Sequence, residues 1–179
     1  IVWGGYFPSL YPAVVARASY VDYVVRGAGE KTLAQLLSML REGGHRNLTG
    51  IAGLSWHQNG ESFHNADRPI FGGRASSIAS YRLLGDPRTY LATTALGRRT
   101  AAHQAALGCR FRCTFCGVAS MFRGVTTLPT VAVLERDLLY LKNDLGADSI
   151  QFYDHNFFDR EVDMVPLLEV MAKVAMPWW

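Results

Sequence analysis

The sequence predicts an α/β fold, in which short strands and helices alternate along the chain. Residues 1–3 are a short apolar run, and residues 21–25 and 149–153 are two further candidates for strands. Apolar side chains recur every three or four residues over 33–40 and 131–145, which is the spacing of one helix face. Strand–loop–helix units of this kind build parallel sheets covered by helices, and ligands then bind at the carboxyl ends of the strands.

The N-terminal part of the chain follows this alternation. The strand at 1–3 ends in two glycines, and Pro12 suits the first turn of a short helix. The strand at 21–25 is followed by the helix at 33–40, and Gly43 stands where a C-terminal cap is expected. We therefore expect the order β-α-β-α, as in an open parallel sheet.

A hairpin and a linker are predicted next. Asn59-Gly60 is a strong hairpin signal because both residues tolerate positive φ, and it joins expected strands at 51–56 and 61–64. Residues 65–94 are rich in Gly, Pro, Ser and Arg and show weak periodicity, so we predict a linker with some local structure.

The C-terminal part returns to alternation. Residues 101–107 are expected to form a buried strand, and the cysteines follow it directly. Pro129 and Thr130 open the helix over 131–145, which Gly146 ends. The elements expected after it are a strand at 149–153, a helix at 163–174 with Pro166 near its start, and a strand that begins at 177.

Composition excludes several classes of protein. With 179 residues, 49% of them apolar and 18% charged, and a net charge of +3, the chain is not of the disordered type. No run approaches the roughly 18 consecutive apolar residues of a spanning helix, so no membrane segment is expected. The chain begins at Ile1 inside one apolar run and ends at Trp179 in another, so we expect an internal piece of a longer protein.

The cysteines are the most informative residues. Cys109, Cys113 and Cys116 have the spacing C-x3-C-x2-C, and thiolates of this kind suit zinc and iron–sulfur clusters. So few thiols, clustered and without a signal peptide, indicate a reducing compartment and a cytoplasmic protein. A structural zinc site normally has four ligands, and the nearest candidate for the fourth is His103. Three thiolates suit instead a cubane cluster with one open iron; a zinc loop and three structural thiols are the alternatives.

This cysteine motif, which has Phe115 before the last cysteine and lies after the first strand of a β/α array, resembles that of radical S-adenosylmethionine (SAM) enzymes. The resemblance implies that Cys109, Cys113 and Cys116 hold a [4Fe-4S] cluster whose open iron binds SAM. The cluster would then cleave SAM to a 5′-deoxyadenosyl radical, with electrons from a donor such as flavodoxin or ferredoxin. It also implies that Phe115 lies near the adenine and that Gly117 belongs to the SAM site.

A second polar group follows the strand at 149–153. Asp154, His155 and Asn156 would be costly at the end of an apolar strand unless they meet water, a partner or a ligand. Together with Phe157 they resemble the Asp-Asp-Asn-Phe motif of the cobalamin-associated branch of radical SAM enzymes, with His155 in place of the second acid. The resemblance implies contact with SAM; for His155, a capping or water-bonded role is the alternative.

The N-terminal stretch resembles the late part of a cobalamin-binding Rossmann-like domain. Residues 1–10 contain a strand expected to end in Gly4-Gly5, and residues 21–30 resemble the last strand of that domain and the turn after it. The resemblance implies that backbone at Gly4 and Gly5 approaches the nucleotide tail of the cofactor. A tight turn alone would also explain the two glycines. The Asp-x-His-x-x-Gly motif that supplies the lower cobalt ligand is absent from this sequence.

The resemblance implies three regions. Residues 1–45 would be the C-terminal part of the cobalamin-binding domain, and 46–98 the hairpin and linker. Residues 99–179 would be the N-terminal part of a radical SAM partial (β/α) barrel.

Charge supports an anionic ligand near the cysteines. Residues 98–124 contain five arginines and no Asp or Glu, so they can offset the charge of a thiolate-ligated cluster and a bound carboxylate. A solvated basic loop is the alternative. Basic and aromatic residues do not interleave here as in a nucleic-acid platform, so no nucleic-acid partner is expected.

The function expected from the resemblance is methylation of an unactivated carbon of a small-molecule substrate, with cobalamin as methyl carrier. An oxidoreductase like the anaerobic magnesium-protoporphyrin monomethyl ester cyclase is the alternative within the branch. A methylthiotransferase would carry additional cysteines in its N-terminal domain, and this chain has none. The alternative from another class is a non-catalytic iron–sulfur or zinc module, although electron carriers normally hold a cluster with four protein ligands.

Overall fold

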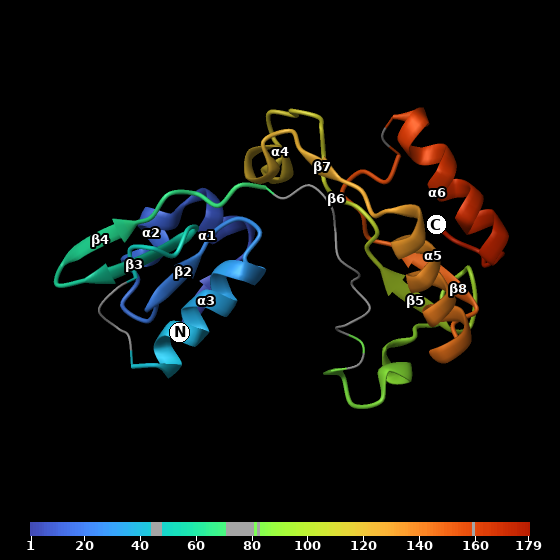
Figure 1. Ribbon diagram of the computed structural model, residues 1–179, viewed down its shortest axis with the longest axis horizontal. Coiled ribbons are helices and arrows are strands. Elements are labelled where there is room, and N and C mark those ends of the chain that lie inside the picture. The colour runs from blue at the N-terminus through green and yellow to red at the C-terminus, as the bar shows by residue number, and fades with distance from the viewer. Residues whose placement is uncertain (44–47, 71–80, 82, 159) are drawn as a thin grey trace. The chain divides into compact units, whose positions relative to one another are not determined.

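The computed structural model describes residues 1–43, 48–70, 81, 83–158 and 160–179 (Figure 1). By contacts the chain divides into two compact units, which we describe separately. The first unit comprises Ile1–Ile70 together with Phe111–Gly124, and the second comprises the other described residues. The helices and strands of the two units together confirm the expected α/β class.

A four-stranded sheet forms the centre of the first unit, in the order β1-β2-β3-β4. Strands β1 and β2 are parallel, and the hairpin β3–β4 extends the sheet with antiparallel pairs on the far side of β2. The elements of this unit are β1 (Val2–Gly4), α1 (Tyr6–Leu10), α2 (Pro12–Ala16), β2 (Tyr23–Val25), α3 (Glu30–Arg41), β3 (Leu54–Gln58), β4 (Glu61–His64) and α4 (Gly117–Phe122).

Helices cover both faces of this first sheet. Val25 packs with Leu36 of α3 and Leu54 of β3 on one face, whereas Val24 packs with Val15 of α2 on the other. Successive residues of a strand point to opposite faces, so a continuous apolar strand such as β2 suits a sheet covered on both sides. The predicted order β-α-β-α is therefore confirmed for this part of the chain.

The predicted hairpin is also confirmed. Asn59 and Gly60 have φ of 52° and 84°, the left-handed conformation of a two-residue turn, and Gln58 pairs with Glu61 across it. Of the predicted linker over 65–94, residues 71–80 and 82 lie outside the described part. Within the described part it holds a short 3-10 helix, η2 (Pro87–Tyr90), capped by Asp86, whose side chain accepts from the Arg88 amide at 3.0 Å.

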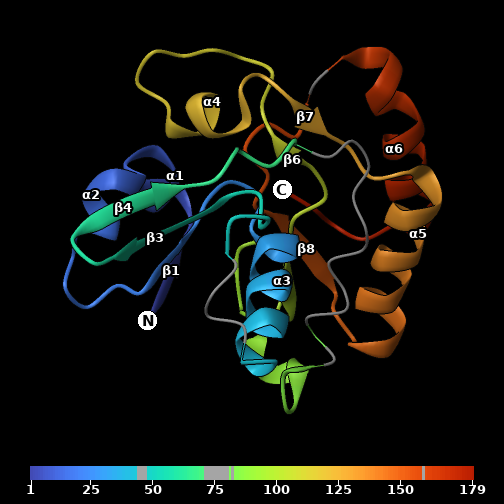
Figure 2. The same cartoon turned by 60° about the vertical axis from the view of Figure 1, so that its left-hand side comes forward.

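The second unit is built on parallel pairing. Strand β5 (Thr100–His103) pairs in parallel with β8 (Ser149–Phe152), and a parallel bridge between Ile150 and Trp178 adds the strand that was expected to begin at 177. The other elements are β6 (Leu107–Gly108), β7 (Thr126–Thr127), α5 (Val131–Leu139), η3 (Tyr140–Asp144) and α6 (Glu161–Val174). Figure 2 shows α5 and α6 side by side.

These two helices supply the core of the second unit. Leu134, Leu138 and Leu141 are fully buried and pack with Ala101 of β5 and Ile150 of β8. As predicted, Thr130 is the N-cap of α5, where its hydroxyl accepts from the Val133 amide at 3.3 Å.

Helix α5 ends in a wider turn that the spacing of its apolar residues did not predict. The segment η3 is π-helical, and the amide of Leu145 donates to the carbonyl of Tyr140, five residues back, at 3.0 Å. The chain leaves the helix at Gly146, which has φ of 75°. The predicted end of the helix is therefore confirmed, and its last turn is π-helical.

The strand predicted at 101–107 is wrong in its length. Strand β5 ends at His103, and the separate strand β6 begins only at Leu107. Between them the amides of Ala105 and Ala106 donate to the carboxylate of Asp154 instead of to a neighbouring strand. An acceptor distant in sequence therefore interrupts a segment whose composition favours a strand.

No described helix has both the length and the apolar composition that crossing a membrane requires.

A carboxylate at the start of β8 holds the start of β5. Asp148 accepts hydrogen bonds from the amides of Arg99 (3.0 Å) and Arg98 (3.2 Å) and from the hydroxyl of Ser149 (3.0 Å). The bond from the Arg99 amide is the main cause that lowers the pKa of the Asp148 carboxyl. The bonds from Ser149 and Arg98 and the charge of Arg99 act in the same direction, and burial opposes them.

We predict that Asp148→Asn lowers the melting temperature at pH 7 and that the difference narrows in acid. The folded-state pKa lies below the unfolded value, so the ionised carboxylate stabilises the fold above the unfolded pKa of about 3.9. This stabilisation is lost as the pH falls through the folded-state pKa. Thermal unfolding between pH 7 and pH 3 measures it, and Glu169→Gln, at an exposed position of α6, is the matched control. An equal effect of Asp148→Asn at both pH values would contradict this account.

Candidate cluster and cofactor site

The second and third cysteines lie at the start of α4. The amide of Cys116 donates to the carbonyl of Cys113 at 3.1 Å, which closes a turn, and Cys116 is the N-cap residue of the helix. Both belong to the first unit, and Cys109, which follows β6, belongs to the second. All three thiols are free; Cys113 is exposed and the other two are half-buried. They are therefore available as soft metal ligands.

No three His, Cys, Asp or Glu side chains come together as a metal-binding group in the part of the chain that the structure describes. His103, the candidate fourth ligand of a zinc site, is buried, with its ring edge-to-face against Phe152 at a centroid distance of 5.8 Å. The fit of a cluster to this chain therefore rests on the chemistry of the donor set, which is three free thiols in one short segment.

Phe115 and Gly117 flank Cys116. The side chain of Phe115 is 91% exposed, so its ring is open to a ligand. Gly117 begins α4 where the helix packs on α1, and an added Cβ there would make ordinary van der Waals contacts with Leu10 (3.5 Å) and Tyr6 (3.8 Å). The structure thus places Gly117 against α1, and the expected contact of either residue with SAM stays a prediction.

The predicted polar residues after β8 hold the backbone that leads to Cys109. The carboxylate of Asp154 accepts from the amides of Ala105, at 3.2 Å, and Ala106, and Nδ1 of His155 accepts from the amide of Gly108 at 3.1 Å. An accepting Nδ1 carries no proton, so a neutral His155 has its proton on Nε2. The Nδ1 atom of His155 therefore has the capping role that was the alternative to ligand contact. Contact of His155 with SAM through its other atoms stays a prediction.

Asn156 differs from its two neighbours. Its side-chain nitrogen Nδ2 is buried and has no hydrogen-bond partner among the described residues. A buried donor without a partner costs about 1–3 kcal/mol, so a polar ligand at this strand end would satisfy it. This orphaned donor, beside the two residues that support the cysteine loop, is the feature of the structure that fits a bound SAM.

The predicted pair Gly4-Gly5 ends β1 as expected. A Cβ on Gly4 would lie 3.3 Å from the carbonyl oxygen of Val25 in the neighbouring strand, and Gly5, the N-cap of α1, has φ of 98°. Backbone geometry therefore favours glycine at both positions, and their contact with cobalamin stays a prediction.

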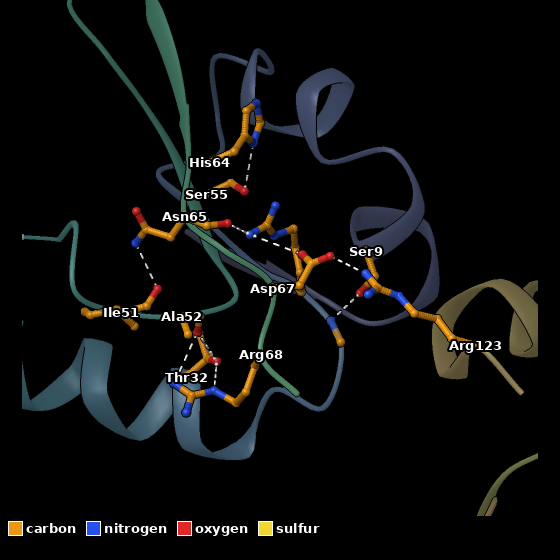
Figure 3. Close-up of polar contacts among 12 residues, drawn as sticks. Ser9, Thr32, Ile51, Ala52, Ser55, His64, Asn65, Asp67, Arg68 and Arg123 are labelled. Atoms are coloured by element: carbon orange, nitrogen blue, oxygen red, sulfur yellow. Dashed lines mark hydrogen bonds and ion pairs between the residues drawn. The ribbon is translucent and has the colours of Figure 1, made fainter. Parts of the chain in front are cut away.

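A chain of charged residues in the first unit was not predicted from the sequence (Figure 3). Asp67 forms ion pairs with Arg26, at 3.4 Å, and with Arg123, which directly follows α4. Burial lowers the pKa of the Arg26 guanidinium, and the carboxylate of Asp67 opposes that shift. These residues are far apart in sequence and belong to no motif, so no local signal predicts them.

The arginines predicted to offset anionic charge are thus partly paired within the protein. Arg99 lies 3.9 Å from Asp148, and Arg123 contacts Asp67. Neutralisation of a bound cluster by the remaining arginines of this stretch stays a prediction.

Comparisons with known proteins agree with the motifs. No protein-family model matches the chain. It is 31% identical over 159 residues to an uncharacterized methyltransferase of Pyrococcus horikoshii. The aligned residues cover 88% of this chain and 33% of the relative. It is 26% identical over 121 residues to the anaerobic magnesium-protoporphyrin IX monomethyl ester cyclase of a Synechocystis species, which covers 65% of this chain and 23% of the relative.

Solved structures share the fold. The radical SAM methyltransferase TsrM of Kitasatospora setae, with cobalamin and a [4Fe-4S] cluster bound, matches 96% of this chain and 33% of its own, with a TM-score of 0.62 and 18% identity. The cobalamin-dependent SAM radical enzyme OxsB, with aqua-cobalamin and SAM bound, matches 97% of this chain and 24% of its own, with a TM-score of 0.63 and 19% identity.

The predicted resemblance to cobalamin-dependent radical SAM enzymes is confirmed. The chain spans a third or less of the length of each of these relatives.

We predict that Asp154→Ala destabilises the protein by about 1–3 kcal/mol, because two backbone amides lose their acceptor. Chemical denaturation measures the free energy of unfolding. Asp163→Ala is the control, since it removes a carboxylate whose partner, Arg160, is an exposed side chain at 2.6 Å, and such surface pairs contribute about 0–1 kcal/mol. Equal losses in the two variants would show that Asp154 does not hold the loop.

Proposed function

We propose that this chain is part of a radical SAM enzyme that uses a [4Fe-4S] cluster and cobalamin to methylate a small-molecule substrate at an unactivated carbon. The observation that carries the proposal is the set of three free thiols at C-x3-C-x2-C spacing, directly after a strand of an α/β unit. Three thiolates leave one iron of a cubane cluster open for a small molecule. The similarity to methyltransferases supports the reaction class.

Each residue of the candidate site has a place in this proposal. The thiolates of Cys109, Cys113 and Cys116 hold three irons. When bound, the cluster supplies the electron that cleaves SAM to a 5′-deoxyadenosyl radical. The orphaned Nδ2 of Asn156 donates a hydrogen bond to a polar group of SAM, and the exposed ring of Phe115 contacts the adenine.

The remaining residues position this site. Asp154 and His155 hold the backbone that leads into Cys109. They do so by accepting hydrogen bonds from the amides of Ala105, Ala106 and Gly108. Because these bonds are made to backbone, they orient the loop whatever side chains it carries. Helix α4 packs on α1 at Gly117, and this packing supports the turn that contains Cys113 and Cys116.

The proposal extends to the organisation of the protein. Residues 1–45 form the last part of a cobalamin-binding domain in which Gly4-Gly5 approach the cofactor, residues 46–98 form a hairpin and linker, and residues 99–179 begin a partial (β/α) barrel. A soluble donor such as flavodoxin or ferredoxin supplies the electron in the cytoplasm. Strands β5 and β8 and the bridge at Trp178 would be the first strands of that barrel.

A cyclase-like oxidoreductase is the second candidate. The relative that favours it is the anaerobic magnesium-protoporphyrin IX monomethyl ester cyclase, at 26% identity. The two reactions differ in their product, since one adds a methyl group to carbon and the other oxidises the substrate. Transfer of a labelled methyl group from SAM to a product would favour methylation.

We predict that Cys113→Ala in the full-length protein abolishes cleavage of SAM. Loss of one of three thiolates leaves the cluster without a complete set of ligands. The measurement is 5′-deoxyadenosine formed by the anaerobically reconstituted enzyme, together with its iron content. Thr114→Ser, at the adjacent exposed residue, is the control and should keep both. Stoichiometric zinc without iron uptake in the wild type would instead support the non-catalytic module.

We also predict that the full-length protein binds hydroxocobalamin with a shift in its visible spectrum. The readout is independent of activity, and it tests the cobalamin part of the proposal separately from the cluster. An unchanged spectrum at saturating cobalamin would leave a radical SAM enzyme that does not use this cofactor.

A further inference from the structure

Helix α4 and the turn before it are held to the first unit at two points. At the N-terminal end, α4 packs on α1 at Gly117, where an added Cβ would lie within van der Waals distance of Leu10 (3.5 Å) and Tyr6 (3.8 Å). Toward the C-terminal end, the ring of Phe122 is buried and lies edge-on to Tyr6 at 6.5 Å between centroids. These apolar contacts place the helix on α1, and a chain of charges lies just beyond its last residue.

The inner member of that chain is Arg26, at the end of β2. Its side chain is 10% exposed and its guanidinium donates to the carbonyl of Asn65, while its backbone amide donates to the carbonyl of Gly53 at 2.8 Å. The side chain of Asn65 donates in turn to the carbonyls of Leu48 (2.6 Å) and Ile51 (2.8 Å). Arg26 is therefore fixed to the sheet and to the hairpin.

The outer member is Arg123, the residue after α4. It has φ of 52°, a left-handed conformation that ends the helix, and its guanidinium reaches the second oxygen of the Asp67 carboxylate. Asp67 therefore lies between a buried cation and an exposed one, with one oxygen toward each (Figure 3). A carboxylate that is already needed to compensate a buried guanidinium is a well-placed anchor for a second cation.

We propose that Arg123 is a positioning residue, which acts through Asp67 and Arg26 to hold α4 and with it the turn of Cys113 and Cys116. This inference rests on the proposed function in that it takes these two cysteines as iron ligands. A helix of six residues is only about 9 Å long, so an anchor at its far end also restrains the turn at its start. Cys116 is itself the N-cap, and its amide closes the turn on Cys113.

The competing account is an ordinary surface ion pair. Arg123 and Asp67 are 67% and 48% exposed, and exposed pairs contribute about 0–1 kcal/mol. The two accounts differ in where the loss of the pair is felt. If Arg123–Asp67 is only a surface pair, its loss leaves the cysteine turn unchanged. If it anchors α4, its loss makes that turn more mobile.

The variant that separates them is Arg123→Met in the full-length protein, because it leaves the Arg26–Asp67 pair intact. Hydrogen exchange of the protein without its cluster is measured over Phe111–Gly124, with β2 as internal reference. We expect exchange over Phe111–Gly124 to accelerate about threefold to tenfold, because the ion pair that is lost involves a carboxylate that also compensates the buried charge of Arg26. Arg123→Lys keeps the charge and should restore most of the protection.

The matched control is Lys173→Met. Lys173 is also an exposed cation, 74% exposed, and pairs with Glu135 at 2.6 Å between α6 and α5. It should leave exchange over Phe111–Gly124 unchanged. Wild-type exchange over Phe111–Gly124 in Arg123→Met, an equal acceleration in Lys173→Met, or an acceleration that extends to β2 would each overturn the anchor.

A second measurement uses the reconstituted protein. The EPR signal of the reduced cluster should broaden in Arg123→Met and respond less to SAM, whereas Arg123→Lys should retain the wild-type signal. Failure of the wild type to take up a cluster would contradict the proposed function, and the exchange experiment would still decide whether Arg123 holds the cysteine turn. A wild-type cluster together with an unaltered signal in Arg123→Met would contradict the effect of the anchor on the iron ligands.

Discussion

The carboxylate of Asp154 determines how the chain leaves the parallel strands of the second unit. By accepting the amides of Ala105 and Ala106 it ends β5 and turns the backbone toward β6 and Cys109. His155 continues the same support at Gly108. The residues that follow β8 thus shape the start of the cysteine loop, because the side chains of Asp154 and His155 accept hydrogen bonds from its backbone amides. The same segment carries the unsatisfied donor of Asn156. The proposed site depends on this combination of a supported loop and an open donor.

The elements that could be predicted from the sequence have local signals. Asn59-Gly60 specifies a hairpin turn through the positive φ that both residues accept, and Thr130 begins α5 because its hydroxyl caps the first free amides. The strand at 101–107 was mispredicted because its apolar composition is also local, whereas the acceptor that interrupts it lies about fifty residues later in the chain. Hydrogen bonding over that distance overrides strand propensity.

The candidate site divides in the same way. The cysteine spacing is a contiguous motif and could be found without a structure. The cost of polar groups at a strand end predicted that Asp154 and His155 have partners, but not that the partners are backbone amides. The ion pairs of Arg26, Asp67 and Arg123 join three distant segments, and each residue alone has the appearance of an ordinary surface charge. Arg26 differs from an ordinary surface arginine only in being buried, which the sequence does not show.

The π-helical turn at Tyr140–Asp144 has a consequence for how relatives are aligned. A π turn holds one residue more than the α-helical turn that it replaces. A relative with a regular helix here would therefore be one residue shorter before β8, and an alignment without a gap in the helix would pair Asp154 with the wrong position. Correspondence of the residues after β8 between homologues is then decided by the structure of this turn, and an ungapped comparison would misassign their roles.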